Sequence, residues 1–457
     1  MSLLLVAVLL AAPEEMTAVA PGALEGRPEA ARQSPVQVRV DAAPAGATIV
    51  IEAGVYRGDL VVERPMRLVG EGRPRLVGSG SGSVVRVRAD GVTLEGFDID
   101  GVAGGDLGRD SSGVHVAARR AVVRDCVIEN ALFGVYLREA DGAVIERNTI
   151  RGIPGRDPGE KGSGIHVWNT SGFLLAGNHI TQARDGIYIQ SSPHGIVRGN
   201  RVDDVRYGLH YMFSDDNLFE DNAFSRGAAG TALMYSRRLT FRRNRFVNNR
   251  GFASVGLLFK NCDDVVAEDN LIADNARGIF LEGSYRNSFR NNLVMASDTA
   301  IVLYDSCGGV RFEGNAFEGN LTPLTLVGRR TDTAFTGNFW SDNDEPDLDG
   351  DGRSDLPYRL SNVFDHLRGN LTAADLMALG FAGRVLATAE QAFPVLRAVP
   401  VVDDRPLVRA PELAEVPGRE GDRGASSVAG IGACVLLLVG GSGGLLAGGQ
   451  WGRKAAR

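Results

Sequence analysis

Four-residue motifs of the form glycine, aliphatic, variable, aliphatic recur along the chain, as GIHV at 164–167, GIYI at 186–189 and GLHY at 208–211. Further copies begin at Gly113, Gly134, Gly230, Gly256, Gly278 and, with alanine in place of glycine, Ala300. Successive copies are 21, 30, 22, 22, 22, 26, 22 and 22 residues apart. A period near 22 residues predicts a solenoid in which each repeat contacts only its neighbours.

A second marker, a single asparagine, repeats in the same phase as the glycine motif. Its members are Asn148, Asn178, Asn200, Asn222, Asn244, Asn270, Asn292, Asn315 and Asn338. Short β-rich segments with Gly and Asn at the corners predict an all-β, right-handed parallel β-helix. We expect about 11–12 rungs over residues 40–345. We expect each motif glycine to make a tight bend before a strand. We expect each asparagine to occupy a left-handed corner and to hydrogen-bond along the axis.

The composition agrees with a solenoid and excludes several other classes. There are 59 glycines in 457 residues without a collagen period, and 44% of the residues are hydrophobic, so neither collagen nor a disordered chain fits. The net charge of −7 disfavours a sequence-independent nucleic-acid binder, which needs basic surface to neutralise phosphates.

One row of outward-facing side chains is unusually rich in histidine, aromatic residues and methionine. Strand alternation points the second and fourth residues after each motif glycine outward. His210, Met212 and Met234 then converge, and His166 and Trp168 lie on the same face. Imidazole and thioether ligands suit Cu(I). The same row also fits an aromatic patch covered by the C-terminal segment or a partner, or a surface that stacks on sugar rings.

The four cysteines are not placed to pair. Cys262 and Cys307 follow equivalent strands two rungs apart, roughly 9.5 Å, which exceeds disulfide reach. Cys126 takes the asparagine position of an earlier rung, and Cys434 lies in an apolar C-terminal segment. We expect no disulfide, and we expect Cys262 and Cys307 to be structural residues at turn edges rather than metal ligands.

An acidic loop, DLDGDGRSD at 347–355, follows the last repeat. Asp347, Asp349, Asp351 and Asp355 stand at positions 1, 3, 5 and 9 of an EF-hand-like loop. Tyr358 occupies position 12, where such loops place a bidentate glutamate. The loop is therefore either a structural Ca²⁺ site or a solvated acidic turn.

The two ends of the chain predict export and membrane anchoring. Residues 1–12 resemble a short signal peptide. Residues 346–410 form the acidic loop and a cap with a helix near 371–391, and 411–424 form a linker. Residues 425–452 are uncharged and long enough for one transmembrane helix, and the basic tail 453–457 is then cytoplasmic.

Several stretches resemble the NosD family, the periplasmic copper-maturation proteins of nitrous oxide reductase. They are ARDGIYI (183–189), DVRYGLHYMFSDDN (204–217), TALMYSRRLTFRRN (231–244), GNFWSD (337–342), DGDGRSDLPY (349–358) and AFPVLRAVPVVDDRPLV (392–408). The rungs alone are shared with many carbohydrate-acting β-helices, whereas YGLHYMFS and ALMYS followed by this C-terminal block are specific. The predicted membrane helix is a departure, because some members end soon after the Pro-rich stretch.

The resemblance implies a copper-delivery protein that is not itself an enzyme. Its implied partners are an ABC-type ATPase (NosF), a permease (NosY), a copper chaperone lipoprotein (NosL) and the reductase (NosZ), with no nucleic acid. The implied place is the periplasmic side of the cytoplasmic membrane. The rival hypothesis is a Ca²⁺-dependent polysaccharide lyase or epimerase, or a carbohydrate-binding β-helix. Its chemistry would need paired carboxylates or a Lys/Arg base, and the outward row offers only Lys260 and Glu282 on neighbouring rungs.

Overall fold

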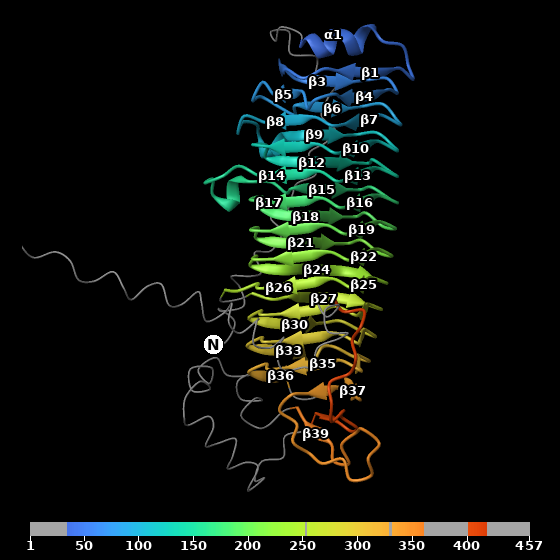
Figure 1. The fold of residues 1–457 in the computed structure, drawn as a ribbon, viewed down its shortest axis with the longest axis vertical. Helices are drawn as coiled ribbons and strands as arrows, with labels where there is room; N and C mark the ends of the chain where they lie inside the picture. Colours follow the sequence, from blue (N-terminus) through green and yellow to red (C-terminus); the bar gives the residue numbers. More distant parts are fainter. Residues whose placement is uncertain (1–33, 252–253, 329–330, 361–400, 418–457) are drawn as a thin grey trace, which may run out of the picture.

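The chain winds into a long three-sided solenoid, described in a computed structural model for residues 34–251, 254–328, 331–360 and 401–417 (Figure 1). Each turn contributes one short strand to each of three parallel sheets, which we call sheets A, B and C. Adjacent strands come from successive turns, so Ile165 of one turn pairs with Ile187 of the next. The expected right-handed all-β solenoid with a period near 22 is confirmed.

Sheet A has 15 strands in the order β1 (Thr48–Ile51), β4 (Arg67–Gly70), β7 (Thr93–Glu95), β10 (Val122–Arg124), β13 (Val144–Glu146), β16 (Leu174–Ala176), β19 (Ile196–Arg198), β22 (Leu218–Glu220), β25 (Thr240–Arg242), β28 (Val266–Glu268), β31 (Ser288–Arg290), β34 (Arg311–Glu313), β37 (Ala334–Thr336), β40 (Val402–Asp403) and β39 (Tyr358–Arg359). All its neighbours are parallel except β40 and β39, which pair antiparallel. The C-terminal segment therefore closes this end of the solenoid.

Sheet B has 13 strands, β2 (Val55–Arg57), β5 (Arg75–Val77), β8 (Asp98–Asp100), β11 (Val127–Glu129), β14 (Thr149–Arg151), β17 (His179–Thr181), β20 (Arg201–Asp203), β23 (Ala223–Ser225), β26 (Arg245–Val247), β29 (Leu271–Ala273), β32 (Leu293–Met295), β35 (Ala316–Glu318) and β38 (Phe339–Trp340). Sheet C has 12, β3 (Leu60–Val62), β6 (Val85–Val87), β9 (Ser112–Val116), β12 (Phe133–Arg138), β15 (Ile165–Trp168), β18 (Asp185–Gln190), β21 (Tyr207–Met212), β24 (Ala229–Arg237), β27 (Leu257–Asp263), β30 (Arg277–Glu282), β33 (Thr299–Tyr304) and β36 (Thr322–Val327).

In the part of the chain that the structure describes, three short helices accompany the sheets. Helix α1 (Pro35–Ala42) covers the N-terminal end of the stack and buries Val36 and Val40 against it. The 3-10 helices η1 (Leu107–Arg109) and η2 (Pro158–Glu160) lie in loops. Helix η2 lies in the loop at 154–162 that the 30-residue step of the repeat predicted.

The solenoid has about 13 turns, more than the 11–12 we predicted. The undercount arises at the N-terminal end. The strands of sheet C in the first two turns, β3 and β6, follow Asp59 and Val84 rather than a motif glycine. Their burial patterns still alternate, because Leu60 and Val62 point inward as Ile187 and Ile189 do farther along.

The repeating asparagines form a continuous, buried hydrogen-bonded column, as expected. The Oδ1 atom of Asn178 accepts from both the backbone N–H and the side-chain amide of Asn148, each at 3.0 Å. The same pair of bonds recurs at every step through Asn338. Cys126 begins the column by donating its backbone N–H to Asn148.

Two of our local explanations were wrong. The left-handed corner is occupied by the residue before each asparagine, such as Arg147, and not by the asparagine itself. The motif glycines do not have positive φ angles either. They are required for space: a Cβ at Gly186 would lie 2.1 Å from Cγ1 of Val202 and 2.7 Å from the carbonyl oxygen of Gly208.

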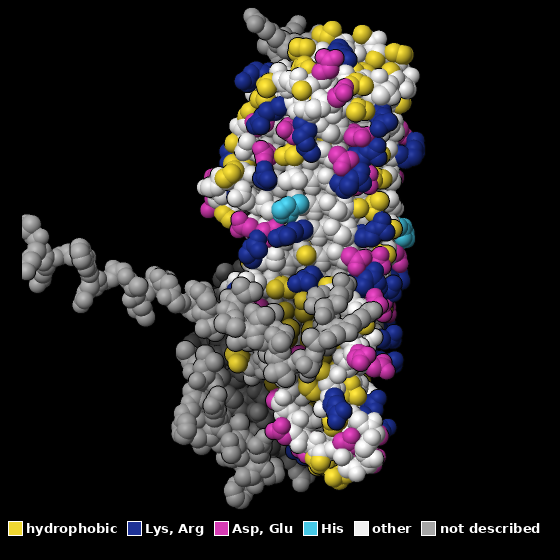
Figure 2. Space-filling model, in the orientation of Figure 1, with side chains coloured by type: hydrophobic (Ala, Val, Ile, Leu, Met, Phe, Trp, Pro, Cys, Tyr) yellow, Lys and Arg dark blue, Asp and Glu magenta, His cyan; other side chains and the backbone are white. Residues whose placement is uncertain are grey.

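Columns of ion pairs run along the outer edges, visible as adjacent dark blue and magenta side chains in Figure 2. An arginine of one turn binds the aspartate of the preceding turn with two hydrogen bonds, as Arg147 binds Asp125 and Arg286 binds Asp264. These pairs are exposed, so each adds little stability. Because of these pairs, most charged side chains along the edges lie next to a side chain of opposite charge.

Several predicted segments lie outside the described residues. They are the signal peptide at 1–12, the helix near 371–391, the transmembrane helix at 425–452 and the tail at 453–457. No helix of the described residues is long and apolar enough to span a membrane. Residues 411–417, the start of the expected linker, pack Leu413 and Val416 against Leu293 and Ala316.

Candidate functional site

A row of stacked rings runs along the outer face of sheet C across five consecutive strands. The ring centroids of His115 and Tyr136 are 5.3 Å apart, those of Tyr136 and His166 are 4.4 Å apart, and those of His166 and Tyr188 are 4.4 Å apart. His210 ends the row with its ring edge-on to Tyr188 at 4.9 Å. Because the parallel strands are in register, residues 22 or so apart in sequence become direct neighbours.

The first two histidines of this row are held neutral. Burial lowers the pKa of His166 to about 3 and that of His115 to about 4. The Nδ1 atom of His166 is buried without a hydrogen-bond partner among the described residues. A neutral imidazole with a free nitrogen is the form that binds a metal ion.

His210 is positioned by a buried carboxylate. Its Nδ1 atom lies 3.2 Å from Oδ2 of Asp185, and Arg206 binds the same carboxylate at 2.9 and 2.8 Å. Hydrogen bonds from His210 and Arg206 outweigh burial and hold the pKa of Asp185 well below its usual range. A carboxylate on Nδ1 directs Nε2 outward, as in many metal-binding histidines.

Our sequence analysis did not predict a role for Asp185. A signal was present, because Asp185 is the one acidic residue that directly precedes a glycine of the repeated motif. The other motifs are preceded by Ser112, Phe133, Ser163, Tyr207, Ala229, Val255 and Arg277.

The two predicted methionines lie side by side next to His210. Met212 of β21 pairs in register with Met234 of β24, and both side chains are half-buried on the outer face of sheet C. The Tyr188 hydroxyl lies 3.9 Å from Sδ of Met212. His210, Met212 and Met234 are therefore brought together on two neighbouring strands.

His166 lies farther along the row and does not join the group formed by His210, Met212 and Met234. Tyr188 separates it from His210 in the row, so the two histidines are two strands, roughly 9.6 Å, apart. Trp168 lies at the edge of the same face, under the guanidinium of Arg138 at 5.1 Å. His166 therefore belongs to the row but not to the same coordination point as His210.

The cysteines within the described residues are free, as expected. Cys126, Cys262 and Cys307 are all buried. Burial raises the pKa of Cys126 and of Cys262 to about 12 and also raises that of Cys307. Buried thiols of this kind are poor metal ligands because the thiolate is disfavoured.

The acidic loop brings three of its four predicted aspartates together. Carboxylate oxygens of Asp347, Asp349 and Asp355 lie within 4.8 Å of one another. Asp351 instead forms an ion pair with Arg405 at 2.8 Å. Tyr358 donates its hydroxyl hydrogen bond to Asp342, so it does not complete the loop.

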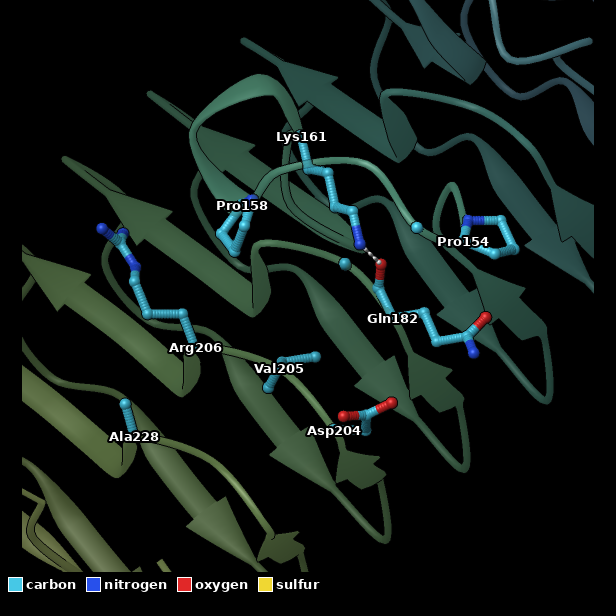
Figure 3. A pocket seen from close by; sticks show the side chains of 10 residues that line it. Pro154, Pro158, Lys161, Gln182, Asp204, Val205, Arg206 and Ala228 are labelled. Carbon is cyan, nitrogen blue, oxygen red and sulfur yellow. Dashed lines mark hydrogen bonds between the residues drawn. The ribbon is translucent and has the colours of Figure 1, made fainter. Parts of the chain in front are cut away.

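A cleft of about 470 Å³ opens beside the loop at 154–162 (Figure 3). Lys161 spans it and donates a hydrogen bond to the carbonyl oxygen of Gln182 at 3.2 Å. Arg206 lines the cleft and also binds Asp185, so it connects this cleft to the support of His210.

The described part of the C-terminal segment does not cover the row. Leu413 and Val416 pack against residues of sheet B, which are Leu293, Ala316, Leu271 and Met295. Phe339, from the same sheet, also contacts this cluster. Within the described residues, the C-terminal segment thus leaves the row uncovered, while Leu132, Phe133 and Ile153 bury Tyr136 at one end of it.

Comparisons with known proteins agree with this architecture. A family model described as "Right handed beta helix region" matches residues 83–215, and one described as "Periplasmic copper-binding protein (NosD)" matches residues 153–345. A protein of Pseudomonas aeruginosa named "Probable ABC transporter binding protein NosD" is 34% identical over 80% of this chain and 89% of its own length. A protein of Stutzerimonas stutzeri with the same name is 34% identical over 79% and 86%.

Solved structures share the fold at low sequence identity. The A-module of the mannuronan C-5 epimerase AlgE4 of Azotobacter vinelandii has a TM-score of 0.57 at 15% identity, covering 65% of this chain and 94% of the module. The A-module of AlgE6 from the same organism has a TM-score of 0.52 at 15% identity, covering 66% and 93%. These similarities concern the fold alone.

Fold and site together define a parallel β-helix binding protein with soft candidate ligands on one face. The similarity to the two curated relatives extends over most of both chains, including the strands that carry His210, Met212 and Met234. The chain belongs to the NosD family.

Proposed function

We propose that this chain binds Cu(I) on the outer face of sheet C and delivers it for assembly of the copper centre of nitrous oxide reductase. The observation that carries the proposal is the placement of His210, Met212 and Met234 on two adjacent strands, with Asp185 behind His210. The family description as a periplasmic copper-binding protein supports the choice of metal.

The ligand chemistry favours Cu(I) over harder cations. Two thioethers and one imidazole are soft or borderline ligands, whereas Ca²⁺ and Mg²⁺ prefer oxygen. The Asp185 carboxylate, whose pKa is held low by its hydrogen bonds, lies against Nδ1 of His210 and leaves Nε2 for the metal. Copper transfer is then an exchange of ligands at the metal, in which no covalent bond of the protein is broken.

His166 is proposed as a second, auxiliary copper ligand along the row. Its Nδ1 atom is buried without a partner among the described residues, and its low pKa keeps the ring neutral at physiological pH. The two-strand separation from His210 favours a position that copper occupies before or after the His210 position.

The proposed setting is the periplasmic side of the cytoplasmic membrane, with the helix at 425–452 as anchor. The names of the relatives support an ABC transporter as partner. By resemblance to the family, we propose the ATPase NosF and permease NosY as this transporter, the chaperone NosL as copper donor and the reductase NosZ as acceptor. The ATPase would supply the energy.

We also propose a structural Ca²⁺ at Asp347, Asp349 and Asp355. Three carboxylates whose oxygens lie within 4.8 Å would repel one another without a cation. Arg405, from the segment that caps the solenoid, binds the neighbouring Asp351. A cation here would hold the loop together, and the Asp351–Arg405 ion pair joins the loop to the C-terminal cap.

The carbohydrate-active alternative lacks a suitable pair of groups. Lys260 and Glu282, its best candidates on the row, form an ion pair with each other at 3.3 Å. No pair of free carboxylates lies on the row within the described residues of sheet C. The likeness to epimerase modules concerns the fold alone.

The direct test is titration of the purified full-length chain with Cu(I) in the presence of a competing chelator. We expect one tightly bound Cu(I) that is lost in the triple variant His210→Ala/Met212→Ala/Met234→Ala. Equal copper binding by wild type and triple variant would refute the site. Activity on uronate polymers without copper binding would favour the alternative.

A further inference from the structure

Two exposed aromatic rings stack on each other beside the methionine pair. Phe213 directly follows Met212, and Tyr235 directly follows Met234. Their ring centroids are 5.1 Å apart and their planes differ by 8°. Phe213 is 54% exposed and Tyr235 is 47% exposed. Large apolar rings stacked in water on adjacent turns are not there to fill the core.

Both residues adopt the left-handed backbone conformation that recurs at the corners of this solenoid. Phe213 has φ +51° and Tyr235 has φ +53°, and they are the only Phe, Tyr or Trp residues with positive φ among the described residues. Long side chains such as Arg147 and Arg243 adopt the same φ at other corners, so what distinguishes this pair is its exposed aromatic rings and not its backbone.

The same corner takes small or polar residues on the other turns. The equivalent position, five residues after the motif glycine, is Glu139, Asn169, Ser191, Asn261 and Gly283, all with positive φ. Asparagine and glycine tolerate this conformation best. The aromatic exception therefore occurs on just the two turns that carry Met212 and Met234.

The charges around the ring pair are already compensated. Arg238 forms ion pairs with Asp216 at 2.6 Å and with Asp215 at 3.3 Å. Arg237 lies 3.9 Å from Asp263. A patch with apolar rings at its centre and ion-paired side chains at its rim has the anatomy of a protein-binding hot spot.

We propose that Phe213 and Tyr235 form the docking surface for the protein that donates Cu(I) to this chain, with an uncharged, apolar face around its metal. This inference rests on the proposed function. Ligand exchange requires the donor's copper to come within bonding distance of the Met212 and Met234 sulfurs, so the docking surface must border these residues. The compensated rim selects a donor whose metal-bearing face is apolar rather than acidic or basic.

The test uses the full-length chain and the double variant Phe213→Asn/Tyr235→Asn. Asparagine occupies this corner at Asn169 and Asn261, so the variant is expected to fold at least as well as wild type. Binding to immobilised Cu(I)-loaded NosL is measured by interferometry. We expect at least 10-fold weaker binding by the double variant, with unchanged Cu(I) affinity in chelator competition. Tyr285→Asn, at an exposed tyrosine (46% exposed) that follows β30, two strands along from β24, should bind as wild type does.

The outcomes separate the two proposals. If wild type binds copper but the double variant binds NosL within 2-fold of wild type, the docking inference is wrong and the copper site stands. A change in oligomeric state, or in binding to NosZ alone, also overturns the docking inference, because the rings then serve a different partner. If wild type binds no copper, the proposed function itself fails.

Discussion

Asp185 and His210 lie on adjacent turns, with Oδ2 of Asp185 3.2 Å from Nδ1 of His210. Asp185 is fully buried and is also bound by Arg206. We predict that Asp185→Asn lowers the Cu(I) affinity by about 10- to 100-fold, because the carboxylate that orients the imidazole is lost. Chelator competition with the purified full-length variant measures the change.

Sheet B supplies a matched control for this substitution. Asp203 is also buried, lies 3.2 Å from Nε2 of His179 and is bound by Arg226. Asp203→Asn should therefore cost similar stability but leave copper affinity unchanged. Equal losses of affinity in the two variants would mean that Asp185 acts through stability alone.

The neutral histidines predict a dependence of stability on pH. The pKa of His166 is about 3 in the folded chain, below its ordinary value of 6.5, so the unfolded chain binds a proton between these values that the folded chain does not. The free energy of unfolding therefore falls as the pH falls from about 6.5 to 3, by about 1 kcal/mol per pH unit for this group.

Substitution of this histidine separates its contribution from those of other groups. His166→Phe keeps a ring between Tyr136 and Tyr188 and removes the titration. Urea denaturation between pH 7 and pH 4 should show a shallower loss of stability for the variant. Parallel curves for the two proteins would contradict the assignment of a neutral, buried ring.

Asp403 ends the asparagine column at the C-terminal end of the solenoid. Its carboxylate accepts from the side chain of Asn338 at 2.8 Å, from the backbone N–H groups of Gly337 and Asn338, and from Nε1 of Trp340. Asp403→Ala leaves these buried donors unpaired and should cost about 3 kcal/mol of unfolding free energy. The exposed neighbour Asp404 gives the control, since Asp404→Ala should be within about 0.5 kcal/mol of wild type by chemical denaturation.

The acidic loop predicts a Ca²⁺-dependent stabilisation. Calcium should raise the unfolding temperature of wild type, and Asp349→Asn should abolish that increase because one carboxylate of the cluster is lost. Asp351→Asn should retain the increase, because Asp351 binds Arg405 instead. Calorimetric scans with calcium and with a chelator measure both. An unfolding temperature insensitive to calcium would leave the loop an ordinary acidic turn.

The sequence predicted the solenoid because its repeat is carried by two markers with a physical role in every turn. The glycines remain essential, but for the space that Gly186 leaves for Val202 rather than for a bend. Sequence spacing cannot distinguish a required φ angle from a forbidden Cβ, since both demand glycine. The number of turns was underestimated because the first two turns, which lie within the predicted span 40–345, pair in register without either marker.

The candidate site was predicted in outline by strand alternation, which placed His210, Met212 and Met234 on one face. Alternation could not predict Asp185, because this residue stands at the start of β18, before the motif glycine, and reaches His210 on the next turn. It also could not separate His166 from His210, which share a row but are two strands apart. The stacking of the Phe213 and Tyr235 rings became visible only in the structure.

The most direct measurement of the central claim is X-ray absorption at the copper edge on the full-length chain loaded with one Cu(I). Our account predicts two sulfur neighbours and one imidazole, from Met212, Met234 and His210, and one sulfur fewer in Met234→Ala. A first shell made only of nitrogen and oxygen, or a spectrum unchanged by Met234→Ala, would contradict it.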